Sequence, residues 1–231
     1  MSINFLTVSR AWLLLAALSL LTSEVAMATE EPVFEVLEKT GSIEIRQYRP
    51  MIVAETVVEG DMDAATNGGF RLIADYIFGN NQSSPGSGES IPEKIAMTAP
   101  VTVAPVARSE KIAMTAPVTV EPQNDVGDRP MQATRWRVHF VMPSEYSLAR
   151  LPKPRNTAVV LREVPGKRYA ALVFSGLVSD EKAQQKTDEL LAWLATRSLR
   201  PAAAPQLARY NPPWTLPFLR RNEILVELPP S

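Results

Sequence analysis

The segment EKIAMTAPVTVAPVARSEKIAMTAPVTVEP (Glu93–Pro122) contains nearly the same sequence twice. Glu93–Pro105 and Glu110–Pro122 are identical except that Ala104 in the first copy is replaced by Glu121 in the second. In both copies apolar residues alternate with small or polar ones, and this period of two predicts a β-strand. Because proline cannot donate a hydrogen bond to a neighbouring strand, Pro100 and Pro117 predict an edge position or a bulge.

Two arrangements of the copies are open. The short link APVARS (104–109) allows them to pair with each other as an antiparallel hairpin, which is the favoured arrangement. In the other arrangement, one copy occupies a native strand and the other copy loops out. In neither case is the repeat itself a catalytic motif.

The residues before the twin segment change to a helical period. DMDAATNGGFRLIADYIFGN (61–80) places Phe70, Ile73, Ala74 and Ile77 on one helical face. Two further large residues, Leu72 and Tyr76, widen this apolar arc beyond a simple buried stripe. We therefore expect a helix that ends in the glycine- and asparagine-rich stretch that follows.

The segment after the twin copies, RWRVHFVMP (135–143), predicts another strand. Alternation places Trp136, Val138 and Phe140 on one face and His139 on the opposite face, beside two arginines.

The rest of the chain repeats the same order of elements. NTAVVLREVPGKRYAALVFSGL (156–177) predicts a hairpin around Pro165 and Gly166, and residues 179–199 predict an amphipathic helix with Ser179 as N-cap. Two short strands around a proline-rich loop follow at 205–229.

The two halves can be aligned so that Arg46 matches Arg162 and Gly60 matches Gly176. Each half has the order β-β-α-β-β, at about 33–143 and 156–229. Because neither half has enough elements to cover its own sheet, we expect them to form one α+β domain over residues 29–231.

The N-terminal segment 1–28 predicts a signal peptide. Arg10 precedes the apolar run Ala11–Leu21, and Ala26-Met27-Ala28 offers small residues for cleavage after Ala28. The run is shorter than the roughly 20 residues that cross a membrane. We expect an exported, periplasmic protein with no later transmembrane segment.

Composition excludes several classes of function. The net charge of −1 gives no basic field for nucleic acid, and the absence of cysteine excludes thiolate chemistry. His139 is the only histidine, and a position on the face of a sheet is favoured over a role as iron ligand. Carboxylates near the first helix, including Glu44 and Glu55, are expected to be solvated charges rather than an acid/base pair. No catalytic constellation is found.

The most unusual composition lies near the C-terminus. Three aromatic residues, Tyr210, Trp214 and Phe218, precede two arginines, Arg220 and Arg221, in the segment YNPPWTLPFLRRNE (210–223). One interpretation is a loop folded onto the core. The other is a rim that binds a flat apolar ligand carrying carboxylates.

Four of these segments together resemble the SOUL haem-binding protein family: KIAMTAPV, GFRLIADYIFGN, RVHFVMP and ARYNPPWTLPFLRRNEILVEL. The match covers essentially the whole chain after the leader. The resemblance implies a distorted antiparallel β-barrel-like sheet of two pseudo-symmetric β-α-β repeats, with one helix per repeat on the sheet. It also implies reversible, non-catalytic binding of haem or a related tetrapyrrole, in a cleft between the first helix and the C-terminal loop.

Carried onto this chain, the resemblance implies two groups of binding residues. They are Phe70, Arg71, Ile73 and Ala74 on the helix, and Tyr210, Arg220 and Arg221 on the loop, to which the aromatic composition of the loop adds Trp214 and Phe218. Some relatives have a lysine after the Pro-Pro pair, where this chain has Trp214-Thr215-Leu216, so one partner for a propionate is missing.

Three other functions stay open. The first is a general carrier or sensor of amphipathic small molecules. The second is a hydrolase or tetrapyrrole-modifying enzyme that uses the carboxylates, and the third is an envelope structural protein. We expect a monomer that binds no metal through a dedicated cluster.

Overall fold

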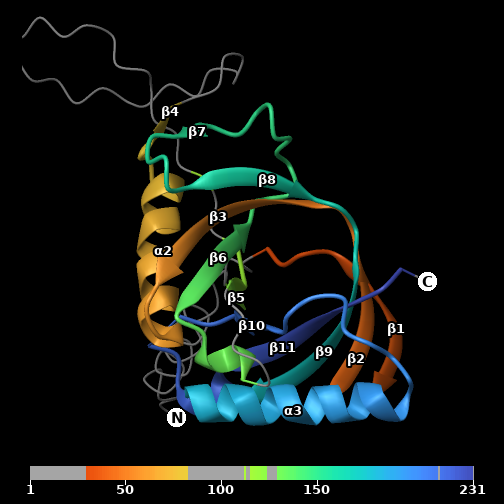
Figure 1. Cartoon of the computed structure of the whole chain (residues 1–231). Helices are drawn as coiled ribbons and strands as arrows, with labels where there is room; N and C mark the ends of the chain where they lie inside the picture. Colours follow the sequence, from red (N-terminus) through yellow and green to blue (C-terminus); the bar gives the residue numbers. More distant parts are fainter. Residues whose placement is uncertain (1–29, 83–111, 113–114, 124–128, 213, 231) are drawn as a thin grey trace, which may run out of the picture.

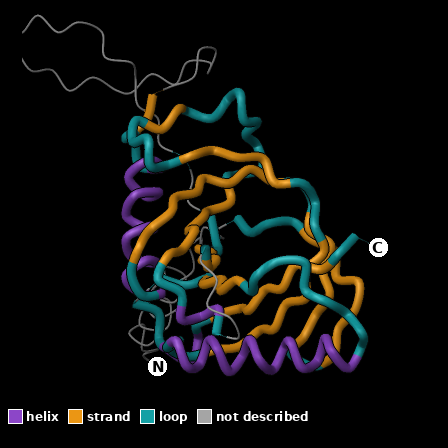
Figure 2. Tube along the Cα trace, in the orientation of Figure 1, coloured by secondary structure: helices purple, strands orange, loops and turns teal. Residues whose placement is uncertain are grey.

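A computed structural model describes residues 30–82, 112, 115–123, 129–212 and 214–230 of the chain. Among these residues, nine strands form one curled antiparallel sheet, and two helices pack against it (Figures 1 and 2). The helices are α2 (Met62–Ile77) and α3 (Asp180–Thr196), and the strands are β1 (Phe34–Thr40), β2 (Ile43–Tyr48), β3 (Met51–Glu59), β5 (Val118–Pro122), β6 (Arg135–Val141), β8 (Val160–Val164), β9 (Arg168–Ser175), β10 (Gln206–Arg209) and β11 (Arg221–Leu228). Shorter elements are β4 (Asn81–Gln82), β7 (Lys153–Pro154) and the 3-10 turns η1 (Pro130–Gln132) and η2 (Pro217–Leu219). The expected α+β class is confirmed.

The order of the strands shows the two-half architecture directly. It runs β1-β2-β9-β11-β10-β5-β6-β3-β8. Without β1, this order is palindromic about the β10–β5 boundary, because β2 corresponds to β8, β9 to β3, β11 to β6 and β10 to β5. Arg46 in β2 and Arg162 in β8 therefore occupy equivalent places, as the alignment of the halves predicted. The pseudo-symmetric fold is confirmed.

The halves are joined by exchange of their first strands. β2 pairs with β9 of the second half, and β8 pairs with β3 of the first half. The predicted hairpin around Pro165 and Gly166 is therefore wrong, because β8 and β9 do not pair with each other. Gly166 instead turns a corner against the equivalent corner of the first half, where an added Cβ would lie 2.9 Å from the carbonyl oxygen of Tyr48.

Helix α2 lies unusually close to the sheet. Asp61 caps its start, since the carboxylate accepts a hydrogen bond from the Ala64 N–H at 2.7 Å. At Gly69 the helix approaches β6 so closely that a Cβ there would lie 2.5 Å from the Cβ of Val138. Glycine is therefore required by packing, although it weakens a helix interior.

Helix α3 follows its sequence pattern. Ser179 is the N-cap, and its hydroxyl accepts a hydrogen bond from the Lys182 N–H at 3.3 Å. The sheet-facing side of α3 is fully buried at four residues: Ala183, Thr187, Leu190 and Leu194. None of the helices in the described residues is both long and apolar enough to cross a membrane.

The second of the twin copies contributes strand β5. This strand pairs with β6 along one edge and with β10 along the other. The expected hairpin of the two copies is therefore wrong at Val118–Val120, because both edges of the strand are occupied. The edge position expected from Pro117 is also wrong, since the strand begins only after the proline, where no ladder hydrogen bond is lost. The first copy, Glu93–Pro105, and the predicted signal peptide lie outside the described residues.

Candidate functional site

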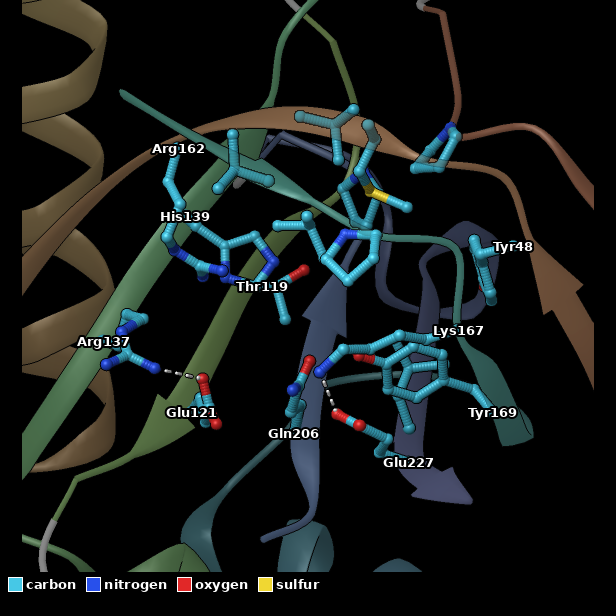
Figure 3. Close-up of a pocket in the computed structure, with 18 of the residues that line it drawn as sticks. Tyr48, Thr119, Glu121, Arg137, His139, Arg162, Lys167, Tyr169, Gln206 and Glu227 are labelled. Carbon is cyan, nitrogen blue, oxygen red and sulfur yellow. Dashed lines mark hydrogen bonds and ion pairs between the residues drawn. The ribbon is translucent and has the colours of Figure 1, made fainter. Parts of the chain in front are cut away.

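The two faces of the curled sheet carry different chemistry. In β6, the predicted apolar face, which includes Trp136, Val138 and Phe140, is buried beneath the helices. Arg137 and His139 project from the opposite, concave face, as alternation predicted (Figure 3). Side chains from every strand of the sheet except β1 meet on this concave face.

These side chains enclose a cavity of about 300 Å³ on the concave face. Its lining combines a group of apolar and proline residues with a group of polar and charged residues. The lining residues are Pro32, Tyr48, Met51, Val53, Pro117, Thr119, Glu121, Arg137, His139, Val141, Arg162, Val164, Pro165, Lys167, Tyr169, Gln206, Tyr210, Leu225 and Glu227. A volume of this size lies at the small end of the range for ligand pockets.

A chain of alternating charges crosses one side of the cavity. Arg162 Nη2 lies 2.7 Å from Glu55 Oε2, Arg137 Nε lies 3.7 Å from the same oxygen, and Arg137 Nη1 lies 3.1 Å from Glu121 Oε2. Burial raises the pKa of Glu55, but the hydrogen bond from Arg162 and the nearby positive charges outweigh it and lower the pKa. The expectation that Glu55 is a solvated charge is therefore wrong.

His139 is a neutral member of this wall. Desolvation lowers the pKa of its imidazole to about 4, and the charges of Arg162 and Arg137 act in the same direction against the attraction of Glu55. Its Nδ1 is inaccessible to solvent and has no hydrogen-bond partner among the described residues. Figure 3 shows the ring beside Thr119, its partner in the β5–β6 register. The position on the face of a sheet is confirmed.

The opposite side of the cavity has its own ion pair. Lys167 Nζ lies 2.7 Å from Glu227 Oε2, close to Tyr169 and Gln206 (Figure 3). Burial raises the pKa of the Tyr169 hydroxyl above its ordinary value, with smaller contributions from Glu227 and Glu121. Tyr169 is therefore a neutral hydroxyl at physiological pH.

A buried network adjoins the cavity on the side of β2 and β11. Arg46 donates to Glu223 through two nitrogens, at 2.8 and 3.1 Å, and to Glu44 at 2.8 Å. Glu44 is also nearly buried, and hydrogen bonds from Lys39 and Arg46 lower its pKa although burial alone would raise it. Glu44 is therefore a structural ion-pair partner and not a solvated charge.

The predicted helix residues divide into two groups. Ile73 and Ala74 are buried in the core between α2 and the sheet, so neither side chain faces a ligand in this arrangement. Phe70 lies at the margin, with 37% of its side chain exposed and its ring edge-to-face with Phe140 at 5.7 Å. Arg71 is exposed.

The predicted loop residues also divide. Trp214 and Phe218 are exposed at 82% and 70%. Tyr210 turns inward to the concave cavity, where its hydroxyl donates to Glu223 Oε2 at 2.8 Å and Arg221 stacks on its ring at 3.9 Å. Arg220 is held against the loop itself, because its Nε donates to the carbonyl oxygen of Thr215.

The structure therefore brings together only part of the predicted site. Tyr210 and Arg221 contact each other, and Arg221 also pairs with Glu31 at 2.9 Å. The loop is joined to α2 at its base, where Arg209 Nη2 lies 2.7 Å from Asp63 Oδ1. Among the described residues, those of α2 line neither this cavity nor the larger one next to it.

Sequence reasoning missed most of the concave face. Glu121, Arg162 and Lys167 line the cavity, and none was singled out as a binding residue. Two signals pointed toward them: the single difference between the twin copies is Glu121 in place of Ala104, and Arg162 matches Arg46 between the halves. Both are evident only once the strands are placed in the sheet.

A family model described as SOUL heme-binding protein matches residues 29–109 and 104–227. The chain belongs to this family. Each of the two matched segments of this SOUL protein contains one copy of KIAMTAPV, at 94–101 and 111–118. The expectation of family membership is confirmed, and the family description supports binding of haem or a related small molecule as its general function.

Solved structures share the fold of this SOUL protein at low sequence identity. The EcmrR C-terminal domain is 7% identical with a TM-score of 0.55, over 86% of this chain and 99% of that one. An uncharacterized conserved protein from Listeria innocua is 12% identical with a TM-score of 0.53, over 81% and 92%. A hydrolase from Listeria innocua is 12% identical with a TM-score of 0.51, over 84% and 94%. Among curated proteins, none matches this chain.

Proposed function

We propose that this protein binds haem or a related tetrapyrrole reversibly and without catalysis, between the C-terminal proline-rich loop and the exposed edge of α2. The observation that carries the proposal is the exposure of large apolar side chains within one short loop. Trp214, Leu216, Phe218 and Leu219 are all more than half exposed. Clustered exposed apolar side chains of this size are typical of a binding surface.

Hydrogen bonds join several of the described residues of the loop. Its backbone closes on itself through the Thr215 N–H to Pro212 carbonyl and Leu219 N–H to Leu216 carbonyl bonds, at 3.0 and 2.9 Å. The Asn211 side chain accepts a further hydrogen bond from the Arg221 N–H at 2.7 Å. A preorganised loop loses little conformational entropy when it binds a flat ligand.

The exposed aromatic side chains suit the flat face of a macrocycle, whereas most of the nearby arginines already have partners. Trp214 and Phe218 supply flat apolar area, and Phe70 extends it from the helix that Arg209 and Asp63 join to the loop. Arg221 is already paired with Glu31 and Glu223, and Arg220 donates to the carbonyl oxygen of Thr215, so the exposed Arg71 is the residue that we propose to hold a propionate.

The proposed binding does not depend on a protein ligand to iron. His139 lies in the wall of the concave cavity and not in the loop. Bound haem would supply an iron with redox and ligand-exchange chemistry, whereas the loop supplies apolar contact area.

An absorption titration of the purified chain from Thr29 onward tests this proposal. Haem and iron-free protoporphyrin are expected to bind with similar affinity, and Trp214→Ala and Phe218→Ala to weaken both by about tenfold. Phe78→Ala is the matched control, because Phe78 is also an exposed aromatic residue but lies at the far end of α2. Unchanged affinity in both loop variants would overturn the proposed site.

The location of the protein is proposed from the predicted signal peptide. Cleavage after Ala28 would release a monomeric, exported, periplasmic protein. Mass spectrometry of the chain recovered from a periplasmic extract measures this directly, and a chain that still begins at Met1 would contradict it.

A second candidate function is favoured by a separate observation. The cavity on the concave face suits a carrier or sensor of amphipathic small molecules, since it combines apolar walls with charged groups. Its chemistry is specific enough to name a class of ligand.

A further inference from the structure

The concave cavity shares part of its lining with a second, larger cavity. The second has a volume of about 880 Å³ and lies between the segment before β1 and the ends of β3 and β6. The residues that line both cavities are Pro32, Met51, Val141, Val164 and Pro165. These apolar residues form a wall common to both cavities, which offers contact area to an extended apolar chain.

In the three ion pairs at the smaller cavity, the side chain of the cation is more exposed than that of the anion. Side-chain exposure is 30% for Arg137 and 17% for Glu121, which form one pair. It is 33% for Lys167 and 18% for Glu227 in a second pair. In the third pair, Arg162 is 44% exposed and Glu55 is 15% exposed. In every pair the carboxylate is the more buried partner, so a ligand meets the cationic groups first.

The hydrogen-bonding capacity of these cations also favours an anion. A guanidinium carries five N–H donors, and a carboxylate partner leaves several of them free. The Nε of Arg137 has no hydrogen-bond partner among the described residues. Next to it, the Nδ1 of His139 also lacks one. Both nitrogens are inaccessible to solvent, so the donors offered to a ligand oxygen are the other N–H groups of the partly exposed Arg137 guanidinium.

Two of the tyrosine hydroxyls at this cavity already have partners. Tyr48 accepts a hydrogen bond from Arg46, and Tyr210 donates to Glu223. An organic cation that pairs with Glu121 or Glu227 would have to displace Arg137 or Lys167, at the cost of an existing ion pair. A carboxylate adds to the cations without breaking either pair.

We propose that the concave cavity binds an amphipathic monocarboxylate with an extended apolar chain. The carboxylate lies beside Arg137 and Arg162, which share Glu55 as a partner, and the chain follows the wall formed by Met51 and Val164, which line both cavities. This site is separate from the proposed tetrapyrrole surface on the loop, and the two proposals can fail independently.

Isothermal titration calorimetry with three ten-carbon probes tests the charge preference. Decanoate is expected to bind one-to-one and about tenfold more tightly than decanol, because charge-assisted hydrogen bonds add to the apolar contact. Decylammonium is expected to bind more weakly than decanol. Equal affinity for decanoate and decanol, or tighter binding of decylammonium, would overturn the proposal.

Two substitutions on the cavity wall test its position. Thr119→Phe fills the centre of the cavity and is expected to abolish decanoate binding, whereas Glu121→Gln releases Arg137 and is expected to strengthen it severalfold. Lys186→Gln removes a cation from the exposed Lys186–Glu189 pair on α3 and is expected to change nothing. Circular dichroism checks that each variant is folded.

The outcomes separate this site from the loop. Trp214→Ala is expected to leave decanoate binding unchanged, and Thr119→Phe is expected to leave haem binding unchanged. Loss of decanoate binding in Trp214→Ala would place the ligand on the loop and overturn the cavity site. If Thr119→Phe fails to fold, weaker or unchanged decanoate binding in Glu121→Gln would overturn it instead.

Discussion

Arg46 and Arg162 occupy equivalent positions in the two halves of the sheet, yet only Arg46 is buried, with side-chain exposures of 2% and 44%. The difference comes from β1, which extends the sheet beyond β2 and places Phe34 against Arg46, with 4.4 Å between the guanidinium carbon and the ring centroid. At the other end of the sheet, β8 is the last strand among the described residues, and no strand there covers Arg162. The two arginines therefore keep equivalent positions in the sheet but have different surroundings.

This difference predicts unequal effects on stability. Arg46→Met is expected to lower the free energy of unfolding by about 3 kcal/mol, because it leaves Glu223 and Glu44 buried without their shared partner. Arg162→Met is expected to cost less than about 1 kcal/mol, since exposed ion pairs contribute little and Arg137 still faces Glu55. Urea unfolding followed by circular dichroism measures both values, and equal losses would contradict the assignment.

The single histidine predicts that the stability of the protein depends on pH between about pH 4 and pH 6.5. The pKa of His139 is lowered to about 4 from an ordinary value of 6.5, so the unfolded chain binds a proton that the folded chain does not between these values. Stability is therefore fully present above about pH 6.5 and falls as the pH drops through the window, by at most about 1.4 kcal/mol per pH unit.

Urea unfolding of the wild type and of His139→Gln at pH 6 and pH 5 measures this slope. Glutamine does not titrate, so the variant is expected to lose little stability between these two values. The carboxylates with lowered pKa values, Glu44 and Glu55, lose their contribution only at lower pH. A variant with the wild-type slope would show that another group is responsible.

Local periodicity was enough to predict the elements of this fold, but not their neighbours. The helical face of α3 and its Ser179 cap depend on residues within a few turns of each other, and both were predicted correctly. The turn signal at Pro165-Gly166 is compatible with a hairpin and equally with a corner between distant strands. The corner forms because β8 and β9 each find a better-placed partner in the other half, which is a long-range choice.

The concave site was hidden for a related reason. Polar residues at alternate positions of a strand normally face water, so Glu55 was expected to be solvated. The curl of the sheet turns this polar face inward, and the pairing of β3 with both β6 and β8 brings Glu55 within ion-pair distance of Arg137 and Arg162. The aromatic loop around Trp214, by contrast, was recognised because its composition is unusual over only a few residues.

The close approach of α2 to the sheet predicts that alanine substitution has different effects on stability at two adjacent glycines. Gly69→Ala is expected to destabilise the protein by about 1–3 kcal/mol, because the new Cβ would overlap Val138. Gly68→Ala is the matched control, since its Cβ meets only Val58 Cγ1, at 3.2 Å. There the higher helix propensity of alanine, about 1 kcal/mol, is expected to offset the contact. Thermal unfolding compares the two, and equal melting temperatures would contradict the packing argument.

The twin copies allow a sharper test of what β5 requires. Deleting residues 93–109 leaves the second copy, and deleting residues 106–122 leaves the first copy, so the two shortened chains differ only by Glu121 or Ala104 at one position. In each, segment 83–92 and a Glu-Lys pair still connect Gln82 to the isoleucine that corresponds to Ile112. This connection is ample, because the Ile112 N–H donates to the Ile77 carbonyl at the end of α2.

Both shortened chains are therefore expected to fold. The chain with Ala104 is expected to be less stable by less than about 1 kcal/mol, since Arg137 loses its partly exposed partner Glu121 while every other β5 side chain is kept. Circular dichroism melting of the pair measures the difference at a single residue in an otherwise identical background. Failure of only the chain with Ala104 to fold would mean that the Arg137–Glu121 pair is essential to the sheet, and not an adjustable part of the concave cavity.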